Sequence, residues 1–193
     1  MNDWLSQYLQ AERTKADRRK CFISYFSADR TEVDRFIESF SDVMIPKAIG
    51  VSDRDDFIDS SNSDYVMGKI REKYLGDSSV TILLIGRCTH SRRYIDWELK
   101  STLRRGSYAP NGLLGILLPS MGYQGILPPR FKHNWDSADT QYALYRAYPD
   151  SSMTLKGWIE EAYRRRTSRS ELIVNSQEMF KYNRQCEVHG VTH

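Results

Sequence analysis

Apolar positions along the chain follow two alternating patterns. Residues 80–86 and 113–118 are almost continuously apolar, which is typical of parallel strands covered on both faces. Between such runs the apolar residues recur at helical spacing, as in residues 31–40, where they fall at i, i+3, i+4 and i+7. The pattern predicts strands at residues 20–24, 48–51, 80–86, 113–118 and 142–148, and helices at residues 31–40, 64–75, 91–105 and 154–166.

Strands that alternate with helices favour one parallel sheet with helices on both of its faces. The predicted fold class is therefore α/β, a flavodoxin-like three-layer sandwich with a five-stranded, mainly parallel sheet. Residues 80–85 are expected at the centre of this sheet because they are continuously apolar. Residues 48–51 are expected at an edge, because Pro46 and Gly50 accompany that short run.

The chain divides into three predicted parts. Residues 1–19 are expected to form a helical extension, residues 20–170 the α/β domain, and residues 171–193 a C-terminal tail. One side of the extension is apolar, so it is expected either to pack on the domain or to dock on a second copy of the chain. That side carries Trp4, Leu5, Tyr8 and Leu9.

Composition excludes several classes of protein. With 193 residues, of which 40% are hydrophobic and 27% charged, the chain resembles ordinary soluble globular proteins. Its net charge is only +3, and its one basic cluster, within residues 164–169, is typical of a solvated helix end rather than of a nucleic-acid site. The first 20 residues lack the apolar core of a signal peptide, and no apolar run has the length of a membrane span. We therefore expect a cytoplasmic protein that binds neither nucleic acid nor membranes.

The cysteines and histidines indicate no metal site. Cys21, Cys88 and Cys186 are odd in number, widely spaced and without a CxxC motif, which favours reduced thiols in a cytosolic protein. The four histidines show no zinc spacing. Residues 52–56 are acidic but lack the longer ligand pattern and terminal Glu of a calcium loop. We therefore expect neither a metal nor a bound cofactor.

Glu98 is the most informative residue of the chain. It lies in the third predicted helix, directly after the most continuous apolar strand. In open α/β sheets, ligands bind outside the carboxyl ends of the strands, at the point where the strand order reverses. The helical phase places Glu98 at the edge of the apolar stripe of its helix. Its carboxylate is therefore expected either in a cleft or on the surface, paired with Arg92 or Arg105.

Two neighbouring segments supply further candidate site residues. Residues 24–29 (Ser-Tyr-Phe-Ser-Ala-Asp) follow the first strand and are expected to face Glu98 across one crevice. Tyr25 or Phe26 in this loop either stacks on a nucleobase or nicotinamide ring or closes the top of the core. Arg92 lies in the first helical turn, where the macrodipole disfavours a cation. It therefore indicates an anionic partner, either protein carboxylates or a pyrophosphate.

Two motifs together resemble TIR domains. Residues 21–29 (Cys-Phe-Ile-Ser-Tyr-Phe-Ser-Ala-Asp) are similar to the opening strand and loop of these domains. Residues 91–99 (Ser-Arg-Arg-Tyr-Ile-Asp-Trp-Glu-Leu) resemble the segment that leads into their catalytic Glu. The Ser-Arg-Arg-Tyr lead-in and residues 145–148 (Tyr-Arg-Ala-Tyr) are most similar to the bacterial TIR-like proteins of the Thoeris antiphage system. The resemblance covers residues 20–166 and departs at two places: at Trp97, where many TIR domains have Cys or Tyr, and in the acidic loop of residues 52–56, which matches the family poorly.

The resemblance implies that residues 20–170 form a TIR-like domain that cleaves NAD⁺ at the nicotinamide–ribose bond, with NAD⁺ as substrate and no cofactor. The implied product is an ADP-ribose-derived signal, hydrolysed, cyclised or conjugated, that activates a separate effector in antiphage defence. Glu98 carries over as the catalytic residue, and self-association through TIR-type contacts is expected. The expected substrate-binding residues are Ser24, Tyr25, Phe26, Asp53, Ser91, Arg92 and Trp97.

Two other functions stay open at this point. A TIR-like adaptor would bind protein partners without chemistry, and the presence of Glu98 argues against it without excluding it. A flavodoxin-like nucleotide-binding module would need a Ser/Thr-rich phosphate loop after the first strand, which is missing. Release of free nicotinamide from NAD⁺ distinguishes the enzyme from both alternatives.

Overall fold

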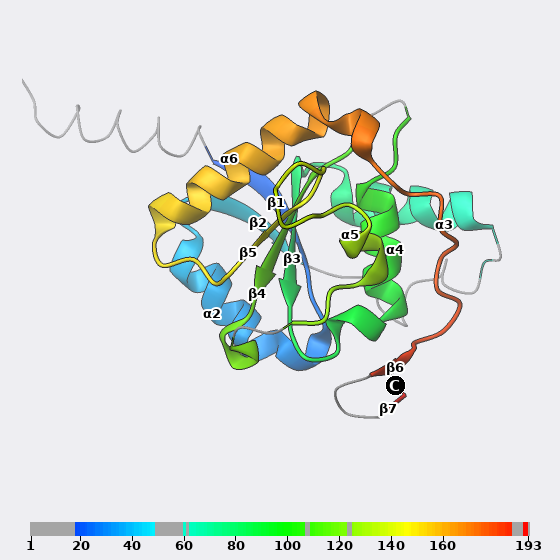
Figure 1. Ribbon diagram of the computed structural model, residues 1–193, viewed down its shortest axis with the longest axis horizontal. Helices are drawn as coiled ribbons and strands as arrows, with labels where there is room; N and C mark the ends of the chain where they lie inside the picture. Colours follow the sequence, from blue (N-terminus) through cyan, green and yellow to red (C-terminus); the bar gives the residue numbers. More distant parts are fainter. Residues whose placement is uncertain are drawn as a thin grey trace, which may run out of the picture.

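The computed structural model describes residues 18–48, 60, 62–106, 109–122, 125–186 and 191–192. Its centre is a five-stranded sheet in the order β2-β1-β3-β4-β5, in which every pairing is parallel (Figure 1). The strands are β1 (Arg19–Ser24), β2 (Met44–Ala48), β3 (Val80–Ile85), β4 (Gly112–Leu117) and β5 (Leu144–Arg146). The predicted flavodoxin-like α/β fold is confirmed, with β3 at the centre of the sheet.

Helices cover both faces of this sheet. One face carries α2 (Arg30–Phe40) and α6 (Ser152–Ser168), and the other carries α3 (Ser63–Ile70), α4 (Arg93–Thr102) and the short α5 (Pro129–Lys132) (Figure 1). Single helical turns are η1 (Ser27–Asp29), η2 (Arg71–Leu75), η3 (Thr89–Ser91), η4 (Pro119–Met121) and η5 (Ser170–Leu172). A separate two-stranded ribbon pairs β6 (Gln185–Cys186) with β7 (Val191–Thr192).

The central strand β3 is apolar because both of its faces are covered. All six of its residues are buried. Ile82 and Leu84 belong to the core formed with α2 and α6, whereas Leu83 and Ile85 belong to the core formed with α4. A strand between two apolar layers has few positions for polar side chains. This explains why β3 is a nearly continuous apolar run in the sequence.

The edge strand β2 lies earlier in the chain than predicted. It runs over Met44–Ala48, so the prediction of a strand at residues 48–51 was wrong in position. Pro46 lies inside β2 rather than beside it. An edge strand tolerates proline because only one of its sides has to supply ladder hydrogen bonds. Residues 49–51 lie outside the described residues.

The other predicted boundaries shift by a few residues. The predicted strand at residues 142–148 shortens to β5, and the helix predicted at residues 91–105 divides into η3 and α4. The helix α5 was not predicted, because its four residues are too few to show a helical period. Of the predicted extension, Arg19 already belongs to β1, and residues 1–17 lie outside the described residues, as does Asp53.

Candidate functional site

Ser24 and Glu98 meet at the carboxyl end of the sheet. Ser24 is the last residue of β1, and Glu98 lies in the second turn of α4, which follows the neighbouring strand β3. The Ser24 hydroxyl donates a hydrogen bond of 2.6 Å to Glu98 Oε2. A bond this short is typical of a hydroxyl that donates to a carboxylate. Glu98 therefore contacts the end of the first strand, as predicted, whereas the expected crevice between them stays a prediction.

The Glu98 side chain is buried. Glu98 is 1% exposed and Ser24 is fully covered, which excludes the alternative of a surface Glu98. Burial of a carboxylate is costly unless other groups stabilise it. Because Glu98 has almost no contact with solvent, a ligand reaches it only after the residues that cover it move.

A buried cation lies next to the loop that follows Ser24. The Arg92 guanidinium carbon is 3.8 Å from the centroid of the Phe26 ring, a cation–π arrangement. Arg92 is 6% exposed, and its Nε and Nη2 atoms are buried without a hydrogen-bond partner among the residues that the structure describes. Unpaired buried guanidinium nitrogens are costly. A phosphate or carboxylate of a ligand would accept hydrogen bonds from both nitrogens and remove that cost.

Asp29 ends the segment of residues 24–29 and is a further polar residue at this end of the sheet, although it was not among the predicted substrate-binding residues. Within the described part of the chain its Oδ2 atom is buried without a hydrogen-bond partner. It packs so tightly on Gly86 that a Cβ atom at Gly86 would lie 2.0 Å from Oδ2. Burial, and then the nearby Glu32, raise the pKa of Asp29 to about 6, whereas Arg87 and Arg92 act in the opposite direction. The Asp29 carboxyl therefore changes charge at a higher pH, about 6, than an ordinary aspartate does.

Three other predicted substrate-binding residues make contacts within the protein. Tyr25 packs against the core shared by α2 and α6. The Ser91 hydroxyl donates to the carbonyl of Cys88 at 2.9 Å. Trp97 is buried in the core beneath α3, and its indole nitrogen donates to the carbonyl of Phe180 at 2.8 Å. The predicted residues that gather at the carboxyl end of β1 are Ser24, Phe26, Arg92 and Glu98. Their contacts with a substrate stay predictions.

A C-terminal segment, residues 173–186 and hereafter the C-terminal strap, lies along α4 (Figure 1). The Phe180 amide donates to Asp96 Oδ2 at 2.9 Å. Further along, the Arg184 amide donates to the carbonyl of Ser91 at 2.8 Å. The strap therefore reaches from the middle of α4 to the residues that lead into it.

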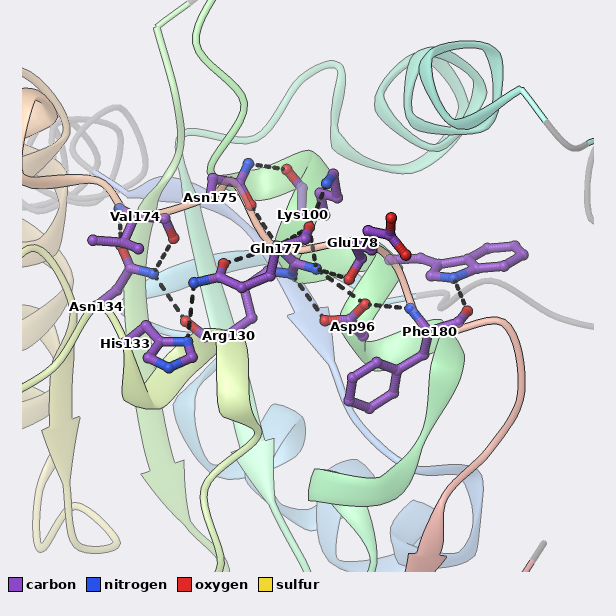
Figure 2. A network of polar contacts seen from close by, with 11 residues as sticks. Asp96, Lys100, Arg130, His133, Asn134, Val174, Asn175, Gln177, Glu178 and Phe180 are labelled. Carbon is purple, nitrogen blue, oxygen red and sulfur yellow. Dashed lines mark hydrogen bonds and ion pairs between the residues drawn. The ribbon is translucent and has the colours of Figure 1, made fainter.

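A buried ion pair anchors this strap. Arg130 of α5 donates to both carboxylate oxygens of Asp96, from Nε at 2.8 Å and from Nη2 at 3.2 Å (Figure 2). The same guanidinium donates to the carbonyls of Gln177 and Glu178 in the strap. Both charged side chains are buried, with exposures of 1% and 4%. Asp96 thereby ties α4, α5 and the strap together two residues before Glu98.

A cavity of about 470 Å³ lies at the other end of the sheet. It is lined by Gly68, Arg71, Glu72, Gly76, Arg104, Arg105 and Gly106. These residues lie around the carboxyl ends of α3 and α4. The chain runs from the end of α4 into the start of β4, so the cavity lies at the amino end of β4. The candidate site is therefore identified by its buried carboxylate and by the two Arg92 nitrogens that lack a partner among the described residues, not by the size of a cavity.

Comparison with known proteins points to one family. A family model for the Thoeris protein ThsB, TIR-like domain, matches residues 22–122, a span that contains Ser24, Arg92 and Glu98. No curated protein matches the chain. Over the described ranges, no group of three or more His, Cys, Asp or Glu residues is arranged to hold a metal ion. None of the helices described combines the length and the apolar character needed to cross a membrane.

Proposed function

Because the chain belongs to the TIR-like domain family of the Thoeris protein ThsB, we propose that it is an NAD⁺-cleaving signalling enzyme of antiphage defence. The proposed reaction breaks the bond between nicotinamide and ribose. It leaves ADP-ribose in a hydrolysed, cyclised or conjugated form, which diffuses as a signal to a separate effector. The enzyme acts in the cytoplasm on free NAD⁺ and uses it as substrate rather than as a resident cofactor.

The observation that carries this proposal is the buried Glu98 carboxylate held by Ser24 at 2.6 Å. The nicotinamide ring of NAD⁺ is already cationic and leaves as a neutral molecule, so its departure needs no general acid. The transition state resembles an oxocarbenium ion, as in glycoside cleavage. A preorganised carboxylate stabilises this positive charge and accepts hydrogen bonds from ribose hydroxyls. Ser24 fixes the orientation of the carboxylate.

Arg92 supports the same substrate. NAD⁺ carries a pyrophosphate, and phosphate oxygens match the two guanidinium nitrogens that lack a partner in the described part of the chain. The Phe26 ring holds the guanidinium in place from one side. Binding of the pyrophosphate at Arg92 leaves the nicotinamide ribose to reach towards the buried Glu98.

Substitution of Glu98 tests the proposed reaction. Glu98→Gln is nearly isosteric but removes the negative charge, so we expect nicotinamide release to fall by about 10²- to 10³-fold. Glu160→Gln is the matched control, because Glu160 lies on α6, where it pairs with Arg19 at 2.8 Å. Nicotinamide is measured by chromatography, both for the purified chain and in extracts of phage-infected cells that contain any activating trigger.

Two outcomes contradict the proposal. Equal nicotinamide release by the parent and by Glu98→Gln would remove Glu98 from the reaction. Absence of nicotinamide release by the parent in infected-cell extracts, together with retention of specific protein partners, would instead support the adaptor function.

A further inference from the structure

Two cysteines that are far apart in the sequence meet beside the candidate site. The Sγ atoms of Cys88 and Cys186, separated by 98 positions, are 2.7 Å apart, and both residues are buried. Cys88 lies between β3 and η3, whereas Cys186 lies in β6 at the end of the C-terminal strap. Figure 1 shows β6 next to the start of α4. Thiols are only weak hydrogen-bond donors and acceptors, so hydrogen bonding alone gives little reason to bring these two sulfur atoms together.

The cysteines mark the junction between the strap and the residues that lead to Glu98. The carbonyl of Cys88 accepts the hydrogen bond from the Ser91 hydroxyl at 2.9 Å. The carbonyl of Ser91 in turn accepts from the Arg184 amide of the strap at 2.8 Å. Arg92 follows at once in the sequence and stacks on Phe26. A bond between the two sulfur atoms would therefore join the strap covalently to the segment that carries Arg92.

We propose that Cys88 and Cys186 form a reversible disulfide that fastens the C-terminal strap to the segment that leads into α4 and carries Arg92. The effect of this disulfide on catalysis rests on the NAD⁺-cleaving function proposed above. Disulfides in cytosolic proteins are usually transient and catalytic or redox-sensing. The link would hold the segment that carries Arg92 against the strap, so it lowers the fraction of molecules in which this segment can move to admit a substrate. Oxidation switches the enzyme off, and reduction restores it.

The oxidant in this proposal is hydrogen peroxide. One thiolate attacks a peroxide oxygen, the O–O bond breaks, and a sulfenic acid forms while hydroxide leaves and takes up a proton. The second thiol attacks the sulfenic sulfur, the S–O bond breaks, and a second water leaves. In total, two thiols and one peroxide give one disulfide and two waters, and the two electrons pass from sulfur to oxygen. Thiol–disulfide exchange with glutathione reverses the bond.

The buried position of the pair determines when it reacts. Burial raises the pKa of the Cys88 thiol, and the neighbouring Cys186 adds to this effect, whereas Arg92 opposes it. The thiolate therefore forms mainly when the strap lifts and water enters. Cys21 is the control for thiol reactivity within the same chain. It is fully buried in β1, and burial raises the pKa of its thiol strongly.

The test compares the full chain with Cys186→Ser and with Cys21→Ser. After peroxide treatment, we expect the parent to lose two hydrogens in its intact mass and to yield a Cys88–Cys186 linked peptide. Proteolysis within the strap should slow, and nicotinamide release should fall at least about tenfold and recover with a reducing agent. Cys21→Ser should respond like the parent, and Cys186→Ser should show none of these changes.

Several outcomes overturn the proposal. One is the absence of the linked peptide, and another is a linked protein whose strap proteolysis is unchanged. A third is inhibition by peroxide that persists in Cys186→Ser. A metal ion retained in native mass spectrometry by the parent, and lost in Cys186→Ser, would assign the pair to a metal site instead. If the parent releases no nicotinamide at all, the proposed function fails, whereas the linked peptide and the proteolysis still decide whether the disulfide fastens the strap.

Discussion

At the scale of single residues, the candidate site consists of polar groups that the fold buries in one place. Glu98 receives its hydrogen bond from Ser24, while Arg92 and Asp29 hold buried atoms that lack partners in the described part of the chain. Buried polar groups are nearly always paired in folded proteins. The exceptions at this end of the sheet are therefore the atoms that the proposed substrate would have to satisfy.

Replacement of Ser24 by alanine tests how Glu98 is positioned. Ser24→Ala removes the hydroxyl that donates to a buried carboxylate, so we expect the free energy of unfolding to fall by about 1–3 kcal/mol. The turnover number for nicotinamide release should fall by about 10- to 100-fold, because a misplaced catalytic group loses rate rather than affinity. Ser39→Ala, at an exposed position of α2, is the control. A higher Michaelis constant at unchanged turnover number would assign Ser24 to substrate binding instead.

The charge of Asp29 predicts a pH dependence of stability. The pKa of Asp29 is raised from 3.8 to about 6, so the folded protein holds this proton more tightly than the unfolded chain. The stability that this proton gives is present below pH 3.8 and is lost as the pH rises to about 6. Because Asp29 is partly exposed and screened by solvent, the loss should be about 1 kcal/mol.

Urea unfolding of the parent and of Asp29→Asn at several pH values measures this effect. The stability of the parent relative to Asp29→Asn should decrease between pH 3.8 and about 6. Glu38→Gln, at an exposed position of α2, controls for a general effect of charge. A difference between parent and Asp29→Asn that does not vary over this range would show that Asp29 titrates normally.

At the scale of elements, the periodicity of apolar residues was sufficient to predict most helices and strands, because that signal is local. The position of Glu98 was predictable too, since helical phase and the position of α4 after β3 together determine which end of the sheet it occupies. The strap was not predictable in this way. Its anchor joins Asp96, Arg130 and Phe180, which come from three separate segments and meet only through tertiary packing. The place of Trp97 in the core was not predictable either, because an indole ring suits a core and a binding site equally well.

The strap anchor predicts a large effect of Arg130 on stability. Arg130→Met leaves the buried Asp96 carboxylate without its cation, and such a loss costs about 3–5 kcal/mol. The strap should also become more sensitive to limited proteolysis, because the carbonyls of Gln177 and Glu178 lose the hydrogen bonds that Arg130 donates. Lys132→Met, on the same short helix but exposed, is the matched control. Urea unfolding of Arg130→Met within about 0.5 kcal/mol of the parent would show that the ion pair is not an anchor.

At the scale of the whole molecule, the central question is how a closed site admits a substrate. Glu98 is buried, and the strap lies along the helix that carries it. A cavity of about 470 Å³ lies at the other end of the sheet, away from Glu98. A second molecule can favour an open conformation only if it binds that conformation more tightly than the closed one. The self-association implied by the family offers such a partner, and the predicted helix before β1 offers an apolar side for it.

Self-association predicts that activity depends on protein concentration. If contact between copies opens the site, the specific rate of nicotinamide release should rise with protein concentration, because the associated fraction grows by mass action. For a weak dimer we expect a rise of about tenfold or less across a hundredfold range of concentration. Trp4→Asp should abolish this rise, because it places a charge on the apolar side of the predicted helix. Gln10→Asp is the matched control, since Gln10 falls on the opposite side of the predicted helix. Light scattering with and without NAD⁺ measures the assembly in parallel. A specific rate that is independent of concentration, from a protein that stays monomeric, would refute activation by assembly and leave the chemistry at Glu98 unaffected.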